Sequence, residues 1–177
     1  MKTFIEIGSC DFRTLNHLSD HGWLGIIVDP VKKYLDNLDR KPNVVYENVA
    51  ISDKRGAVDL YQFREDLINK DYDFAGMSTI HPIEENLHLM DKISVEAITY
   101  QDLIERNGIE RVDFLKIDTE GHDLTILKTV IFDGPLRPQI IKVEHEYCNE
   151  IEMKEFLEER GYYVEVEKYD MFAISLK

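Results

Sequence analysis

Acidic side chains follow several of the short apolar runs in this sequence. Asp29 follows one run, Asp118 and Glu120 follow another, and Glu144 ends a third. If these runs are parallel strands, their carboxyl ends meet at one edge of a sheet, where open α/β folds bind ligands. Carboxylates gathered there can accept hydrogen bonds from hydroxyl groups, take up a proton or favour a cationic ligand. We therefore expect an acidic ligand-binding site at this edge.

A glycine and an acid have the spacing of a nucleotide-binding fold. Gly8 follows the first apolar run, and Asp29 comes about 20 residues later, where such folds place an acid that binds the ribose hydroxyls. The alternative is that Gly8 is a turn glycine and Asp29 a helix-terminal acid before Pro30. The pair together favours a ligand that contains ribose.

The residues after Gly8 argue against a dinucleotide. A pyrophosphate-binding turn needs glycine where this sequence has Cys10 and Arg13, and Asp11 adds negative charge beside it. S-adenosylmethionine carries a sulfonium cation, which acidic strand ends favour. The sequence therefore favours S-adenosylmethionine over NAD.

Strand and helix patterns alternate along the 177 residues. Strands are expected at 4–8, 25–29, 44–46 with 49–51, 57–63, 93–98, 112–118 and 140–144, with a closing hairpin of 162–166 and 171–175. Helices are expected at 11–20, from 30 onward, from a Thr99/Asp102 cap to 107, at 121–132 and from an Asn149 cap to 160. This order predicts one α/β domain, 1–177, with a doubly wound, mostly parallel sheet, helices on both faces and an antiparallel C-terminal hairpin.

Five motifs, in this order and at this spacing, resemble those of the FkbM-type methyltransferases. They are Phe4–Ser9, Val28–Pro30, Asn48–Asp53 with Gly56, Gly76–Ile80 and Phe114–Asp123. The last, which contains Lys-Ile-Asp-Thr-Glu-Gly, is the most specific of them. The usual family pattern has glycine at the position of Phe12 and often asparagine at that of Cys10.

The resemblance implies a seven-stranded, Rossmann-like S-adenosylmethionine fold and methyl transfer, commonly to oxygen. By position, Glu6, Gly8 and Ser9 would line the methionine moiety and Asp29 the ribose. Asn48, Val49 and Asp53 would lie at the adenine. Asp118 and Glu120 would face the transferring methyl group.

Displacement at an activated methyl group depends mainly on positioning, and a base helps when the acceptor is an alcohol. Asp118 is the first candidate base, followed by His81, His122 and Glu144; the alternative for Asp118 is a structural acid that caps the helix near Gly121. Asp118, Glu120 and Glu144 also offer oxygen ligands for Mg²⁺. We expect no metal, because paired aspartates are lacking and Lys116 competes for the same carboxylates.

Residues 64–91 show no clear period and are long for a connection within a domain. We expect a lid or substrate loop there; the alternative is a mobile acidic surface loop.

The charge balance and the apolar pattern exclude several classes of partner. The net charge of −14 argues against nucleic acid and anionic membranes, and no apolar run approaches the length of a membrane span. Cys10 and Cys148 form no disulfide framework, which favours the cytoplasm.

The leading hypothesis is therefore a cytoplasmic S-adenosylmethionine-dependent O-methyltransferase acting on a small hydroxylated acceptor such as a sugar or glycan unit. The alternatives are a protein that binds this cofactor without turnover, or another nucleotide-binding α/β enzyme such as a dehydrogenase.

Overall fold

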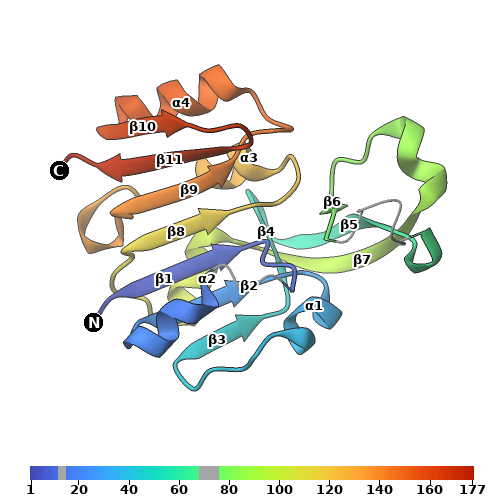
Figure 1. Cartoon of the computed structure of the whole chain (residues 1–177), viewed down its shortest axis with the longest axis horizontal. Coiled ribbons are helices and arrows are strands. Elements are labelled where there is room, and N and C mark those ends of the chain that lie inside the picture. The colour runs from blue at the N-terminus through green and yellow to red at the C-terminus, as the bar shows by residue number, and fades with distance from the viewer. Residues whose placement is uncertain (12–14, 68–75) are drawn as a thin grey trace.

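The computed structural model describes residues 1–11, 15–67 and 76–177. Its larger sheet has seven strands in the order β10-β11-β9-β8-β1-β2-β3 (Figure 1). They are β1 Thr3–Ile7, β2 Leu24–Val28, β3 Val44–Glu47, β8 Phe114–Ile117, β9 Ile140–Glu144, β10 Tyr162–Val166 and β11 Asp170–Ser175. Neighbouring strands are parallel, except that β11 is antiparallel to both β9 and β10. The predicted sheet and its closing hairpin are confirmed.

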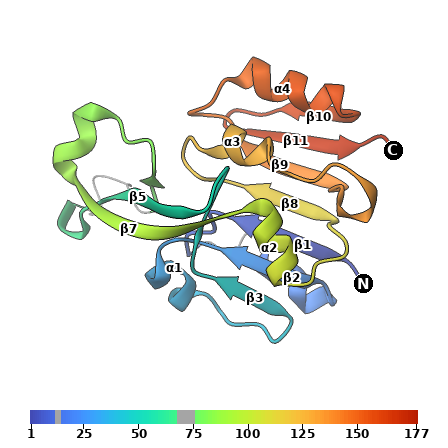
Figure 2. The same cartoon turned by 180° about the vertical axis from the view of Figure 1, so that it is seen from behind.

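Helices cover both faces of this sheet, as predicted, because successive side chains of a strand point to opposite sides. From β1, Ile5 and Ile7 join the main core, whereas Phe4 joins a smaller core on the other face. The main core packs against α2 Tyr100–Arg106, α3 Asp123–Leu127 and α4 Glu150–Glu159. The smaller core lies under the 3-10 helix η1 Asn16–His21 and α1 Lys32–Asn37. Figure 2 shows α2 and α3 on the face turned away from the viewer in Figure 1.

Two predicted helix starts are confirmed, and two helices are shorter than predicted. Thr99 and Asp102 form a capping box on α2, and the Asn149 side chain accepts a hydrogen bond from the Glu152 N–H of α4. The helix predicted at 121–132 is only α3, because the β-branched run 129–131 disfavours its continuation. Of the helix predicted at 11–20, residues 12–14 lie outside the described residues, residues 16–20 belong to η1, and residues 11 and 15 lie in turns.

None of the helices in the described ranges is both long enough and apolar enough to cross a membrane. The longest of them, α4, has 10 residues.

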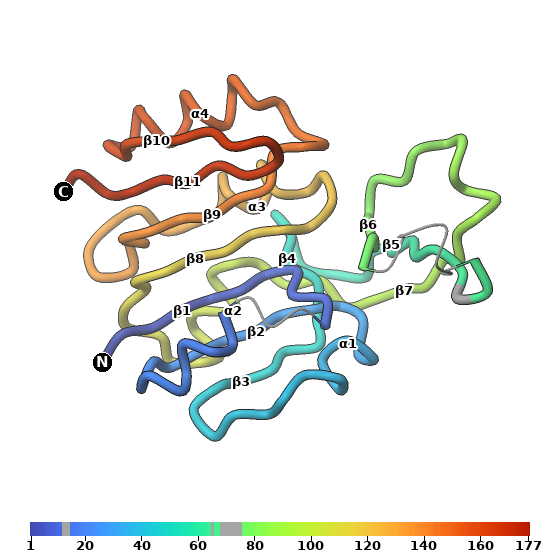
Figure 3. The backbone as a smooth tube through the Cα atoms, viewed as in Figure 1, coloured from blue at the N-terminus to red at the C-terminus, as the bar shows by residue number. Residues whose placement is uncertain are grey.

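A second sheet, which the sequence patterns did not predict, lies beyond the carboxyl ends of the parallel strands (Figure 1). Its order is β4-β7-β5-β6, with β4 Ala50–Ser52, β5 Gly56–Phe63, β6 Ser78–Thr79 and β7 Met90–Thr99. The strand expected at 49–51 therefore pairs with β7 and does not extend β3. In Figure 3, both termini lie at the opposite end of the molecule from this second sheet.

Segment 64–91 connects β5 to β7 and contributes residues to the second sheet. Its described parts hold the short 3-10 helices η2 Glu65–Leu67 and η3 Glu84–Leu89 and all of β6. Residues 68–75 of this segment lie outside the described residues.

Candidate active site

The candidate site lies at the point where the strand order of the larger sheet reverses. The chain runs from β1 outward to β2 and β3, and later returns to place β8 on the other side of β1. Ligands of open α/β folds bind at such a switch point, beyond the carboxyl ends of the strands. A cavity of about 200 Å³ lies there. Seven of the predicted site residues line it, namely Gly8, Asp29, Val49, Asp118, Glu120, His122 and Glu144.

Gly8 permits a close approach between the ends of β1 and β8. Its φ is +76°, and a Cβ atom on Gly8 would lie 1.7 Å from the carbonyl oxygen of Asp118. The Asp118 N–H also donates to the carbonyl of Ile7, at 3.0 Å. The glycine is thus required by the packing of the two strands, in addition to its place in the cavity wall.

Asp29 is buried, and both of its carboxylate oxygens accept backbone hydrogen bonds. Oδ2 accepts from the Cys10 N–H at 2.7 Å, and Oδ1 accepts from the Val31 N–H at 2.8 Å. Burial raises the pKa of Asp29 to about 6, although these two hydrogen bonds oppose the increase. Each carboxylate oxygen can accept a second hydrogen bond. Asp29 is therefore oriented so that it can also bind a hydroxylated ligand.

Cys10 occupies the left-handed region with φ +48°, a conformation that asparagine adopts more readily than most residues. The Cys10 thiol is buried, which raises its pKa to about 12, so it is no nucleophile at neutral pH.

Glu6 lies behind the cavity and not in its lining. Its side chain is completely buried, accepts a hydrogen bond from the Leu15 N–H at 3.0 Å and lies 3.3 Å from Lys116 Nζ. Lys116 is 3% exposed and also contacts Asp118, at 3.0 Å. Burial disfavours the lysine charge, but the two carboxylates outweigh it and raise the pKa of Lys116. A fixed positive charge therefore lies beside Asp118.

Three further predicted cofactor residues lie outside the lining. Ser9 donates to the carbonyl of the next residue, and Asn48 donates to the carbonyl oxygens of Asp29 and Pro30. Asp53 is exposed and accepts a hydrogen bond from the preceding serine. These three side chains therefore form hydrogen bonds with backbone carbonyls or with an adjacent side chain and do not line the cavity.

Asp118, Glu120 and Glu144 form one acidic cluster. One oxygen from each lies within 4.8 Å of the others. Burial, followed by the charge of Asp118, raises the pKa of Glu120 to about 7 and that of Glu144 to about 9. Glu144 is therefore protonated at neutral pH. Hard oxygen ligands suit a divalent cation, but the ammonium group of Lys116 beside Asp118 opposes one.

The raised pKa of Glu144 predicts how stability depends on pH. Between the ordinary value of 4.5 and about 9, the folded protein binds more protons than the unfolded chain, so its free energy of unfolding falls as pH rises. Glu144→Gln stays neutral and should melt at a higher temperature than the wild type at pH 8–9, with the difference vanishing near pH 4.5. Melting curves across this range, with the exposed Glu159→Gln as control, test this. If the melting temperatures of the wild type and Glu144→Gln differ by the same amount at every pH, the raised pKa of Glu144 is contradicted.

The loop after Asp118 is held by Asp123, a residue that the sequence motif included but to which no role was assigned. Its carboxylate accepts hydrogen bonds from the N–H groups of Thr119 and Gly121, at 2.8 and 3.0 Å. His122 is the residue that precedes α3, and no side chain caps this helix. The alternative that Asp118 caps the helix is therefore wrong. The Asp118 carboxylate instead contacts Lys116 and lines the cavity.

His81 and His122 form a hydrogen-bonded pair across two parts of the chain. His122 is buried, and its Nδ1 lies 2.9 Å from His81 Nε2 while its Nε2 lies 3.1 Å from the Ser52 hydroxyl. Burial lowers the pKa of His122 to about 4, so this ring is neutral. Because Ser52 donates to Asp53, we assign the His122 Nε2–H as donor to Ser52 and the His81 Nε2–H as donor to His122.

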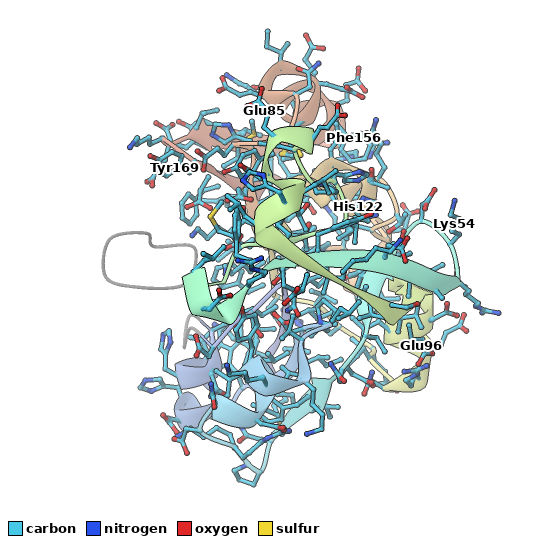
Figure 4. All side chains as sticks on the ribbon, turned by 90° about the vertical axis from the view of Figure 1, so that its right-hand side faces the viewer. Lys54, Glu85, Glu96, His122, Phe156 and Tyr169 are labelled. Atoms are coloured by element: carbon cyan, nitrogen blue, oxygen red, sulfur yellow. The ribbon has the colours of Figure 1, made fainter. Side chains whose placement is uncertain are left out.

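The two histidines differ in their surroundings. His122 lines the cavity, whereas His81 is exposed and borders a second cavity. Figure 4 shows His122 toward the middle of the molecule, while Lys54 lies at the periphery.

The sheet order and the cavity at its switch point define a Rossmann-like α/β domain. The chain belongs to the FkbM methyltransferase family, because the family model "Methyltransferase FkbM domain" matches residues 6–164. A comparison with curated protein sequences finds no match.

The comparison with solved structures gives two matches. The crystal structure of a methyltransferase FkbM from Methylobacillus flagellatus KT has a TM-score of 0.61 at 9% identity, over 97% of this chain and 43% of that one. The present chain thus spans less than half the length of this relative. A fibrillarin/Nop5p complex has a TM-score of 0.46 at 14% identity, over 97% of this chain and 70% of that one.

Proposed function

We propose that this protein is an S-adenosylmethionine-dependent methyltransferase that methylates a hydroxyl oxygen of a small acceptor, such as a sugar or glycan unit. The proposal rests on one observation above all: Gly8, Asp29 and the acidic cluster line a single cavity at the switch point of an FkbM-family sheet. Net charge of −14 disfavours nucleic acid as the acceptor.

The cavity residues fit the proposed cofactor. Asp29 would accept hydrogen bonds from the ribose hydroxyls, and Val49 would provide an apolar contact for the adenine. Glu6, Ser9, Asn48 and Asp53 would support these contacts from behind or beside the cavity. When bound, S-adenosylmethionine supplies a methyl group activated by a sulfonium sulfur, which keeps the electron pair of the broken carbon–sulfur bond. The acidic lining favours that positive charge.

The acidic cluster would handle the acceptor proton. As the acceptor oxygen gains its bond to the methyl carbon, its hydroxyl proton must leave, and Asp118, the cavity carboxylate that lies beside Lys116, would take it. Glu144 is protonated at neutral pH and so can donate a hydrogen bond to an acceptor oxygen. The pKa of Glu120, raised to about 7, lies below that of Glu144. His81 would act only through His122 or from the second cavity.

We also propose that residues 1–177 work as a single domain in which segment 64–91 covers the acceptor. Ser78 and Ile80 of this segment line the cavity, which supports that role. We propose in addition that the protein is located in the cytoplasm, because Cys10 and Cys148 are both free thiols.

Calorimetry with S-adenosylhomocysteine and with NAD tests the cofactor. We expect the former to bind and NAD not to bind, because Cys10 stands where a pyrophosphate-binding turn needs glycine. Binding of NAD alone would refute the proposal in favour of a dehydrogenase-like enzyme. Formation of S-adenosylhomocysteine over a panel of sugars and glycosides then separates an enzyme from a protein that only binds the cofactor.

A further inference from the structure

A second cavity, of about 430 Å³, lies beside the first. Its walls come from the end of β5, from the segment around β6 and η3, and from the loops that follow β8 and β9. It therefore lies between the second sheet and the carboxyl edge of the larger sheet. Of its lining residues, only His81 and Glu120 have a part in the proposed methyl transfer.

One thin wall separates the two cavities. Along the extended stretch at β6, Ser78 and Ile80 line the first cavity, whereas Met77, Thr79 and His81 line the second. This alternation follows from the extended backbone, whose successive side chains point to opposite sides. The wall is also fixed, because the Thr79 hydroxyl donates to the carbonyl oxygen of Glu120 at 2.6 Å.

Glu120 belongs to both cavities. It lines the second cavity as well as the first, and its φ of +55° shows a backbone conformation that non-glycine residues rarely adopt. Its carboxylate also lies in the cluster with Asp118 and Glu144. A molecule in the second cavity that contacts Glu120 would therefore lie next to the proposed methyl-transfer site.

The lining of the second cavity restricts what can bind. One group of side chains is apolar or aromatic: Phe63, Met77, Ile83, Met90 and Tyr147. The other is polar: Thr79, His81, Asn86 and Glu120. Among the described residues, no lysine or arginine lines this cavity. A phosphate there would find no lysine or arginine partner in this lining and would face the Glu120 carboxyl, which disfavours it.

We propose that the second cavity is the acceptor site and that it selects an uncharged hydroxylated molecule with a flat apolar face, such as an aryl glycoside, over a phosphorylated one. This inference rests on the proposed function. The apolar side chains would contact the flat face of the acceptor, with Tyr147 as its aromatic partner. His81 and Asn86 would bind its hydroxyl groups, and Glu120 marks the side on which the first cavity lies.

Two probes of known chemistry test this selectivity: phenyl β-D-glucopyranoside and glucose 6-phosphate. Their binding is measured by calorimetry in the presence of S-adenosylhomocysteine. The phenyl glucoside should bind at millimolar concentration, and glucose 6-phosphate at least tenfold more weakly. Equal affinity for the two, or no binding of the glucoside, would overturn the proposal.

A matched pair of tyrosine variants locates the site. Tyr147 and Tyr169 are both 43% exposed, but only Tyr147 lines the second cavity. Tyr147→Ala should weaken binding of the glucoside by about 3- to 10-fold, the usual value of an aromatic contact, while Tyr169→Ala should leave it unchanged. Equal effects of the two variants, or none from Tyr147→Ala, would place the glucoside elsewhere.

Binding of S-adenosylhomocysteine separates this inference from the proposed function. Both tyrosine variants should bind it as the wild type does, because neither residue lines the first cavity. If S-adenosylhomocysteine binds and the glucoside does not, the acceptor site is wrong and the cofactor site stands. If S-adenosylhomocysteine does not bind, the proposed function fails, and with it the assignment of this cavity as an acceptor site.

Discussion

Asp118→Asn is expected to lower the rate of methyl transfer by roughly 10²- to 10⁴-fold while S-adenosylhomocysteine still binds nearly as tightly as to the wild type. The substitution keeps the shape of the side chain but removes the basic oxygen that faces the cavity. Single-turnover formation of S-adenosylhomocysteine, with the glycoside that the wild type methylates best, measures the effect. Calorimetry measures the affinity for S-adenosylhomocysteine.

The melting temperature separates a catalytic role from a structural one. Lys116 keeps Glu6 at 3.3 Å after the substitution, so the buried ammonium group is not left without a carboxylate and the fold should survive. Asp91→Asn, a change at an exposed position of β7 outside both cavities, serves as control and should alter neither quantity. A destabilised but fully active Asp118→Asn protein would move the base to His81 or remove the need for one, since Glu144 is protonated at neutral pH.

The position of Asp29 and of the acidic cluster was predictable because it needs no knowledge of strand order. Asp29, Asp118 and Glu144 each come at the end of an apolar run, and the carboxyl ends of parallel strands share one edge in any order. The same local patterns predicted the capping box at Thr99 and the closing hairpin. These features depend on residues close together in the chain.

Contacts between distant segments were not predictable in the same way. Gly8 was expected at a ligand-binding turn, and it lines the cavity, but the sequence does not show that its Cβ position is taken by the carbonyl of Asp118, 110 residues further along. The second sheet likewise depends on the pairing of β5 with β7, and residues 64–91 between them show no period that indicates it. The contact between His81 and His122 joins residues that are 41 positions apart, so alternation along either segment does not predict it.

The pKa shifts also depend on burial that the sequence does not show. Glu120 and Glu144 have the same side chain, yet the pKa of one is raised to about 7 and that of the other to about 9. Desolvation and the charge of Asp118 raise both values, and the charge of Glu120 raises that of Glu144 in addition. The sequence therefore predicted which carboxyl groups meet, but not which of them carries a proton at neutral pH.

Asp29→Ala is expected to weaken the binding of S-adenosylhomocysteine by about 1.5–3 kcal/mol for each charged hydrogen bond that is lost, which is roughly 10- to 150-fold. The Asp29 oxygens are oriented by the Cys10 and Val31 N–H groups, so no reorientation opposes binding. Alanine also leaves those two N–H groups without their acceptors, so the melting temperature should fall as well. Calorimetry and thermal melting therefore have to be measured on the same protein.

Asp29→Asn and a pH series distinguish binding by Asp29 from support of the turn. Asparagine retains one oxygen for a backbone N–H but has no charge, so its melting temperature should lie between those of the alanine variant and the wild type. Because the pKa of Asp29 is raised to about 6, the wild-type affinity for S-adenosylhomocysteine should be constant above that pH and decrease as pH falls through it. Asp29→Asn should lack this dependence, since it has no group to protonate. If Asp29→Ala loses thermal stability but binds S-adenosylhomocysteine as the wild type does, and the wild-type affinity shows no change near pH 6, then Asp29 supports only the turn at Cys10 and the ribose lies elsewhere.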